Sequence, residues 1–156
     1  MAIKLTIKEV LGKAIQKEIE SQHLYRELGQ RMTDKAAKEA FQELVRQEQE
    51  HQQLLEKYLR GELQGGTLSS EQIIDYKIAE HFKRPEISFS MELKDVFLFA
   101  ANREKASHEF YLNLARIHPP GEVKRLVRRL ARQELEHKQR VEFLYTEVAF
   151  PQTDGG

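Results

Sequence analysis

Hydrophobic residues recur three and four positions apart along most of the chain, which is the pattern of amphipathic helices with one buried face. Glycine and proline are mostly confined to a few short stretches, where helices are expected to end. The pattern therefore predicts four long helices. We expect them to cover about residues 6–32, 34–60, 91–118 and 122–146.

Polar residues at the predicted helix starts indicate N-terminal caps. Thr6 and Glu9 have the spacing of a capping box for the first helix. Thr33 and Asp34 supply a turn and the cap of the second helix, and the hydroxyl of Ser90 can cap the third.

The connections between the predicted helices differ in length. Short turns join the first helix to the second and the third to the fourth, so each pair should form a hairpin. The long crossover between the pairs, residues 61–90, begins with a glycine-rich turn and contains a helical-looking piece, Ser70–Phe82. We therefore expect an all-α fold, a four-helix bundle of two hairpins at residues 6–60 and 91–146. These lie in one domain, residues 1–150, followed by a frayed tail at 151–156.

The two predicted hairpins resemble each other in sequence. A shift of 86 residues places Leu44–Gln53 on Leu130–Gln139, with seven of ten positions identical. The same shift aligns further residues of the first and third helices. This repeat predicts that the hairpins face each other about a pseudo-twofold axis.

Ionisable residues interrupt the apolar face of each predicted helix near its middle. In the first hairpin, Glu18 and Glu48 each lie 15 residues from Thr33 in the turn, so they should lie side by side. The corresponding pair of the second hairpin lies 15 residues from Pro119. A histidine follows three residues after the second glutamate of each hairpin. The six residues of this layer are Glu18, Glu48, His51, Glu104, Glu134 and His137.

Four glutamates packed together would repel one another and would carry a large desolvation cost. No lysine or arginine occupies the apolar face to neutralise them. Two divalent cations would balance four carboxylates and two neutral imidazoles. Mixed carboxylate and imidazole ligands suit iron or manganese, and zinc would satisfy the same charge balance. A solvated glutamate–histidine face is the alternative for one such motif, but the paired arrangement favours a site for two metal ions.

Further residues could support this metal site. Tyr25 and Tyr111 lie seven residues after their glutamates on the same face, so their hydroxyls could hydrogen-bond a ligand carboxylate or act in redox chemistry. Gln47 and Gln133 could accept the free ring N–H of the opposite histidine. His108 lies one turn from a ligand and could also contribute. We expect the remaining histidines, His23, His81 and His118, on the surface.

These motifs resemble the rubrerythrin family of the ferritin-like di-iron carboxylate superfamily. The resemblance rests on Glu18 with Tyr25, residues 47–51 (QEQEH), Glu104 with Tyr111, and residues 133–137 (QELEH). It implies iron ligands at the six residues of the layer, with Glu18 and Glu104 mainly terminal and Glu48 and Glu134 bridging. The implied cofactor is a pair of iron ions.

Two features of the chain depart from the resemblance. The chain has no Cys, so it lacks the four-cysteine rubredoxin module that rubrerythrins usually carry. Ser107 stands where rubrerythrins tend to have a further glutamate, three residues after the ligand of the third helix. The resemblance implies an oxidoreductase that reacts with hydrogen peroxide or O₂ and draws electrons from a separate donor protein such as a rubredoxin. The alternatives are a ferroxidase that stores or detoxifies iron, and a metal-binding module without turnover.

Composition narrows the remaining function classes. The chain has 156 residues with 25 Lys+Arg and 25 Asp+Glu, so a net charge of zero argues against a nucleic-acid binder. The longest apolar run is residues 96–101, and the N-terminus lacks a secretory pattern, so we expect a cytoplasmic protein without a membrane span. Apolar positions such as Leu93, Val96 and Phe99 suggest a homodimer.

Overall fold

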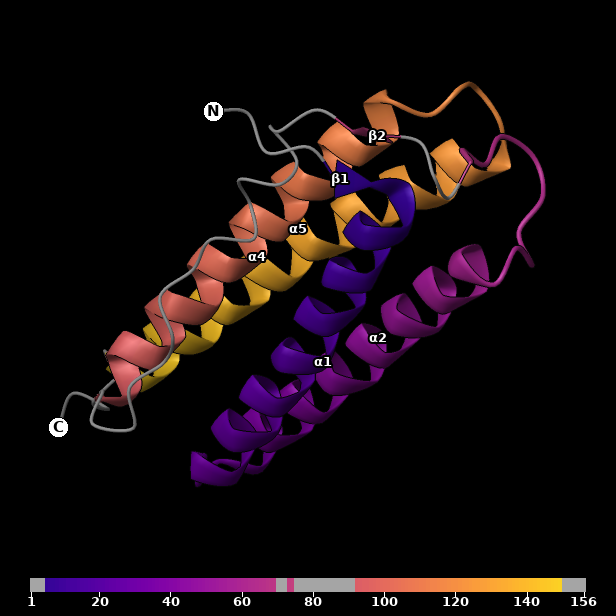
Figure 1. Cartoon of the computed structure of the whole chain (residues 1–156). Coiled ribbons are helices and arrows are strands. Elements are labelled where there is room, and N and C mark those ends of the chain that lie inside the picture. The colour runs from indigo at the N-terminus through magenta and orange to yellow at the C-terminus, as the bar shows by residue number, and fades with distance from the viewer. Residues whose placement is uncertain (1–4, 70–72, 75–91, 150–156) are drawn as a thin grey trace, which may run out of the picture.

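The computed structural model describes residues 5–69, 73–74 and 92–149. Four long helices pack as two hairpins, α1 against α2 and α4 against α5 (Figure 1). The elements are β1 (Leu5–Thr6), α1 (Ile7–Arg31), α2 (Lys35–Leu59), β2 (Ile73–Ile74), α4 (Leu93–Arg116) and α5 (Glu122–Ala149). The predicted four-helix bundle is confirmed. No helix in the described part of the chain is long and apolar enough to cross a membrane.

The first two helices begin where the sequence predicts. The side chain of Thr6 accepts a hydrogen bond from the backbone N–H of Glu9, and the side chain of Glu9 accepts one from the backbone N–H of Thr6. Asp34 accepts one from the N–H of Ala37 at 2.9 Å. The predicted cap at Ser90 is wrong, because α4 has Glu92 at its N-cap, and that side chain makes no capping hydrogen bond.

The crossover begins against the turn between α4 and α5. The N–H of Val123 donates to the carbonyl oxygen of Gly65 at 3.1 Å. A Cβ on Gly121 would lie only 2.7 Å from that same oxygen, so this approach requires glycine. Farther along the crossover, Ile73–Ile74 pairs antiparallel with β1. The predicted helical piece at Ser70–Phe82 is therefore wrong at these two residues, and the rest of it lies outside the described residues, as does the tail.

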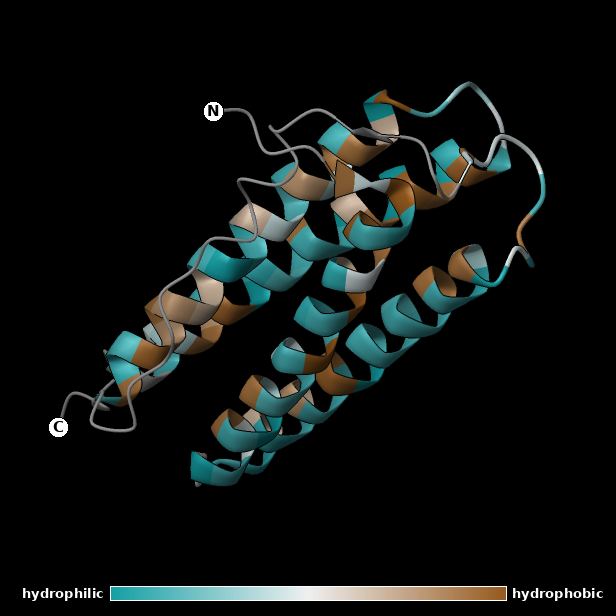
Figure 2. Cartoon of the chain, viewed as in Figure 1, coloured by the Kyte–Doolittle hydropathy of each residue, from teal (hydrophilic) through white to brown (hydrophobic). Residues whose placement is uncertain are grey.

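Two hydrophobic clusters form the core, one toward each end of the bundle. The cluster at the α4–α5 turn contains Ile7 and Leu114, and the cluster at the α1–α2 turn contains Leu28 and Phe97. In each helix, the predicted ionisable layer falls between residues of the two clusters. The outer edge of α2 is predominantly hydrophilic (Figure 2), as expected for a helix with one buried face.

The apolar residues that the sequence predicts at a homodimer surface are less exposed than expected. Val96 is buried in the core, so it is not available for pairing, and Leu93 and Phe99 are only partly exposed. The large exposed apolar side chains in the described part of the chain include Leu98 and Phe143. The helix register explains the correction, because Val96 lies one residue from Phe97 on the buried face of α4.

Candidate metal centre

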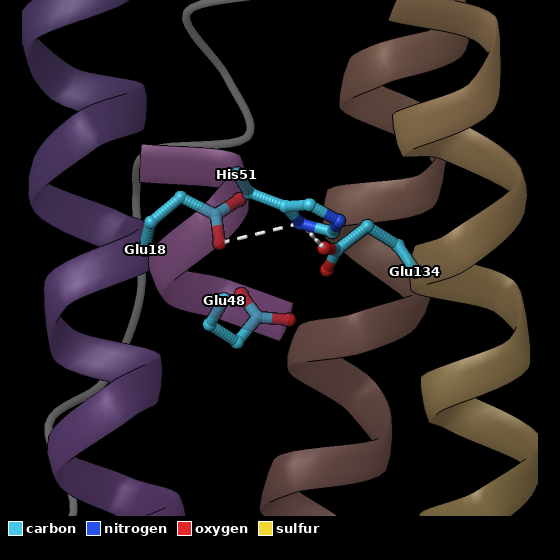
Figure 3. A group of neighbouring side chains, drawn as sticks. All are labelled: Glu18, Glu48, His51 and Glu134. Carbon is cyan, nitrogen blue, oxygen red and sulfur yellow. Dashed lines mark ion pairs between the residues drawn. The ribbon is translucent and has the colours of Figure 1, made fainter. Parts of the chain in front are cut away.

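All six residues of the predicted layer meet in the interior of the bundle. Glu18 comes from α1 and Glu104 from α4, while α2 and α5 each supply a glutamate and a histidine. Each of the six side chains is at most 3% exposed. Figure 3 shows four of them, Glu18, Glu48, His51 and Glu134, with their polar ends turned toward one another. The layer therefore contains four buried carboxyl groups and two buried imidazoles.

These side chains form two overlapping groups, each with ligand atoms within 4.8 Å of one another. Glu18 and His51 occur only in the first group, and Glu104 and His137 only in the second. The carboxyl groups of Glu48 and Glu134 belong to both. If each group held one cation, these two glutamates would contact both ions, and each of the other residues would contact one. The members of the groups are Glu18, Glu48, His51 and Glu134, and Glu48, Glu104, Glu134 and His137.

Each histidine reaches from its own hairpin to a carboxyl group of the other. The Nδ1 atom of His51 lies 2.7 Å from Oε1 of Glu134 and 3.6 Å from Oε2 of Glu18 (Figure 3). The Nδ1 atom of His137 lies 2.6 Å from Oε1 of Glu48. Neither Nδ1 atom has the angular geometry of a hydrogen bond to these oxygens, although the distances are short. Nitrogen and oxygen instead point toward a common space, as ligands of one ion do.

The outer nitrogen of each imidazole is held by a glutamine of the opposite hairpin. Nε2 of His51 lies 2.6 Å from Oε1 of Gln133, and Nε2 of His137 lies 2.5 Å from Oε1 of Gln47. An amide oxygen only accepts, so each Nε2 carries a hydrogen, and in the neutral imidazole Nδ1 is the nitrogen whose lone pair faces the centre. The expected glutamine contacts are present, and they select the tautomer that a metal ligand needs.

Both buried tyrosines hydrogen-bond to a carboxyl group of the layer across the bundle. The hydroxyl of Tyr111 donates to Oε1 of Glu18 at 2.5 Å, and that of Tyr25 donates to Oε1 of Glu104. Burial and the nearby carboxylates raise the pKa of both phenols well above the ordinary value, so they remain protonated donors. The tyrosines thereby fix one oxygen of each outer carboxyl group and leave the other free.

The donor set passes a direct test of fit for metal ions. Eight buried side-chain atoms in the described residues have no hydrogen-bond partner, and seven of them belong to this layer. Unsatisfied buried polar atoms are costly, and so many at one place need a common partner. Two divalent cations would supply it. The seven atoms are Glu18 Oε2, both oxygens of Glu48, His51 Nδ1, Glu104 Oε2, Glu134 Oε1 and His137 Nδ1.

The central and outer carboxyl groups differ in their acidity. Burial, followed by the charges of neighbouring carboxylates, raises the pKa of Glu48 and of Glu134 well above the ordinary value. Burial also opposes ionisation of Glu18, but contacts with Glu48, His51 and Tyr111 outweigh it and lower its pKa to about 2. The two central groups therefore bind protons more readily than ordinary carboxyl groups, and bound cations would compete with those protons.

Among the histidines outside the layer, one is as exposed as predicted and another is not. His23 is exposed as predicted, and His81 lies outside the described residues. His108 is half-buried, with Nδ1 2.6 Å from the carbonyl oxygen of Ala131. The prediction for His118 is wrong, because this residue is only 2% exposed and its Nε2 lies 2.6 Å from the hydroxyl of Tyr58. Tyr58, 60 residues away, and the carbonyl oxygen of Leu114, 2.7 Å from Nδ1, give the buried ring its polar partners.

The burial of Arg103, which directly precedes Glu104, is not predicted by the sequence pattern. Its guanidinium donates to the carbonyl oxygen of Lys17 at 3.2 Å and to the hydroxyl of Ser21 at 3.3 Å. These contacts join α4 to α1 next to the carboxyl layer. An arginine within a highly charged helix carries no sequence signal that would separate it from solvent-facing neighbours.

Two helical hairpins that enclose four carboxyl groups and two imidazoles define a ferritin-like four-helix bundle. The chain belongs to the rubrerythrin family, whose family model, Rubrerythrin, matches residues 9–145. Among solved structures, a hypothetical protein from Pyrococcus furiosus is 25% identical, with a TM-score of 0.73, and the match covers 96% of this chain and 94% of that one.

A second structural neighbour, from Thermotoga maritima, is described as a ferritin-like diiron-carboxylate protein. It is 23% identical, with a TM-score of 0.72, and the match covers 92% of this chain and 97% of that one. No curated protein sequence matches the chain. The likeness to this neighbour supports the fold, whereas the membership of the family rests on the family model.

Proposed function

We propose that this protein binds two iron ions at the six-residue layer and reduces hydrogen peroxide with electrons from a separate donor. The observation that carries the proposal is the pair of ligand groups that share Glu48 and Glu134. Shared carboxylates hold two ions a few ångströms apart, as a two-electron reaction at one site requires. Manganese and zinc fit the same donors, so the choice of iron rests on the family.

A pair of ferrous ions would supply two electrons, one from each ion. One hydrogen peroxide molecule takes up these two electrons and two protons and yields two water molecules, with cleavage of the O–O bond. O₂ is the alternative oxidant. The chain has no Cys, so a rubredoxin-type donor that returns the electrons must lie outside these 156 residues.

The residues around the layer would keep the ligands in place during turnover. Gln47 and Gln133 hold the imidazoles, and the two tyrosines hold the outer carboxyl groups through hydrogen bonds. The hydrophobic clusters on both sides exclude bulk water. Such a preorganised and dry surrounding limits the movement that accompanies each change of charge.

Anaerobic titration with Fe(II), followed by rapid mixing with peroxide or with O₂, tests the proposal. We expect two Fe(II) per chain and faster oxidation by peroxide than by O₂, with repeated turnover when a reduced donor is present. A centre that binds fewer than two ions, or that stays ferrous in both oxidants, would contradict it. Protein containing zinc that stays inert after iron loading would indicate a module without turnover.

A ferroxidase is the second candidate, and one feature favours it. Ser107 stands three residues after Glu104, so the six-ligand set is symmetric between the hairpins. Such a set suits the oxidation and release of exchangeable iron. Net production of Fe(III) that leaves the protein, instead of peroxide consumption coupled to a donor, would favour this candidate.

A further inference from the structure

A small pocket between α2 and α5 ends directly against the candidate metal centre. Its volume is about 130 Å³, and His137 and Gln47 line it together with Ala40, Glu43 and Arg140. His137 is itself only 2% exposed, so the pocket meets a side chain that is otherwise buried. The opposite edge of the same imidazole, Nδ1, lies near Glu48 and Glu104. One side chain therefore separates the pocket from the second ligand group.

A second cavity adjoins the pocket toward the end of the bundle. This larger cavity, of about 830 Å³, lies at the α1–α2 turn and shares Ala40 and Arg140 with the pocket. Met32, Leu93 and Phe143 also line the larger cavity. The two hollows thus lie next to each other along the α2–α5 interface, the larger at the bundle end and the smaller against His137.

The internal repeat allows this pocket to be compared with the equivalent place beside His51. The histidine and the glutamine are the same in both halves, but three lining positions differ under the 86-residue shift. Ala40 corresponds to Leu126, Arg140 to Leu54, and Glu43 to Arg129. In the other half, a leucine therefore replaces the small Ala40, and another leucine replaces the solvent-exposed Arg140. The second of these, Leu54, packs against the hydrophobic core.

The hydrogen bonds next to the two histidines differ in the same way. Oε1 of Glu43 accepts a hydrogen bond from the amide nitrogen of Gln47 at 3.1 Å. The equivalent residue beside Gln133 is Arg129, which has no acceptor atom on its side chain. The pocket side thus has an amide that is anchored by a carboxylate, and this carboxylate is itself held by Arg46. The second N–H of the anchored amide can donate to a small hydrogen-bonding molecule.

We propose that this pocket is the entry and binding site for a small uncharged oxidant of the peroxide type. The oxidant would approach the centre from the Glu104–His137 side and not from the Glu18–His51 side. The volume holds about four water molecules at roughly 30 Å³ each, which is room enough for one peroxide molecule. This inference rests on the proposed function, because it identifies where the substrate of that reaction binds.

Exchanging the equivalent residues of the two halves tests the proposal. Ala40→Leu places on the pocket side the residue that the other half has, and Leu126→Ala is the matched control. In iron-loaded protein, Ala40→Leu should slow peroxide oxidation and the binding of nitric oxide to the ferrous centre by about tenfold or more, because packed interiors leave no bypass. Iron content should not change, and Leu126→Ala should stay within about twofold of the parent protein.

A reversible plug avoids any effect of the leucine on folding. Because the chain has no Cys, Ala40→Cys introduces a single thiol, and so does Leu126→Cys in the control. Methyl methanethiosulfonate, added after folding and iron loading, attaches a methylthio group, which dithiothreitol removes. The attached group should slow nitric oxide binding at position 40 and not at position 126, and its removal should restore the parent rate.

The readouts separate failure of this proposal from failure of the proposed function. If the parent protein does not react with peroxide, the proposed function is wrong, while nitric oxide still reports on access to the ferrous ions. If plugging position 40 leaves nitric oxide binding unchanged, or if both positions have equal effects, the assigned entry site is wrong even though peroxide is reduced.

Discussion

The two helical hairpins make the same contacts at the centre of the bundle and different contacts at their turns. At the centre, the distance from His51 Nδ1 to Glu134 Oε1 is 2.7 Å, and the distance between the equivalent atoms of His137 and Glu48 is 2.6 Å. The outer nitrogens of both histidines are likewise held by a glutamine of the opposite hairpin. The repeat is thus retained in the contacts of the layer where the four carboxyl groups meet.

The turns of the two hairpins have diverged. His118 and Tyr58 lie near the α4–α5 turn, joined by a hydrogen bond, and the hydroxyl of Tyr58 also accepts one from the N–H of Leu68 at 2.9 Å. The 86-residue shift places Met32 and Leu144 at the equivalent positions near the α1–α2 turn, where both belong to the hydrophobic cluster. A turn needs only good packing, which several residue pairs can supply, whereas the centre needs one geometry.

The largest expected effect distinguishes the shared glutamates from the outer ones. Glu48→Ala should abolish binding of both metal ions, because its carboxyl group belongs to both ligand groups. Glu18→Ala should weaken the binding of one ion and leave the other ion bound. Fe(II) or Co(II) titration of each variant, with Glu134→Ala and Glu104→Ala as the equivalents in the other hairpin, measures the stoichiometry. Equal losses from Glu48→Ala and Glu18→Ala would contradict the bridging assignment.

Replacing the two glutamines tests whether the two halves of the centre contribute equally to the free energy of metal binding. Gln47→Ala and Gln133→Ala should each weaken metal binding by about 10- to 100-fold, the usual effect of removing a residue that orients a histidine ligand. Competition with a chelator of known affinity measures this change. Conservative replacement by glutamate, which keeps an acceptor oxygen, should restore most of the affinity. A large loss of affinity in only one half would show that the two halves are alike in structure but differ in their contribution to the free energy of metal binding.

Much of this centre could be predicted from the sequence because its information is local and repeated. Equal distances of Glu18 and Glu48 from the hairpin turn place them at one height, and the apolar face shows which way they point. The repeat then supplies an independent second copy. Helix geometry, applied to the spacing of these residues, is thus enough to predict a buried carboxyl layer.

The features that could not be predicted depend on contacts between distant residues. His118 is buried by Tyr58, 60 residues away, and β2 forms only because Ile74 meets Leu5. Arg103 is buried because α1 offers it the carbonyl oxygen of Lys17. The partner in each of these contacts lies far away in the sequence, so no local pattern identifies the contact.

Placing a residue of the α1–α2 turn at the equivalent position of the α4–α5 turn should have a smaller effect than the changes at the centre, and the effect should be on stability. His118→Met introduces the residue of the equivalent position and leaves the hydroxyl hydrogen of Tyr58 without its acceptor in the interior. We expect a loss of about 1–3 kcal/mol in the free energy of unfolding, the usual cost of an unsatisfied buried group. The double variant with Tyr58→Leu should lose less than the sum of the two single variants, since each single variant already removes the hydrogen bond between the two side chains. Urea unfolding of the two single variants and the double variant measures the coupling, and strictly additive losses would contradict it.

The smallest expected effect is a dependence of stability on pH that arises at only one of the two turns. Burial, together with the charge of Lys124, lowers the pKa of His118, although its bond to the carbonyl oxygen of Leu114 acts in the opposite direction. The folded state therefore binds a proton here less readily than the unfolded state, whose histidine titrates near ~6.5. The stabilisation is complete above that pH and is lost as the pH falls from it toward the lower pKa of the folded state. The advantage of the parent protein over His118→Met should accordingly shrink between about pH 7 and pH 5. The same comparison for Met32→Leu at the other turn should be independent of pH, because neither residue titrates.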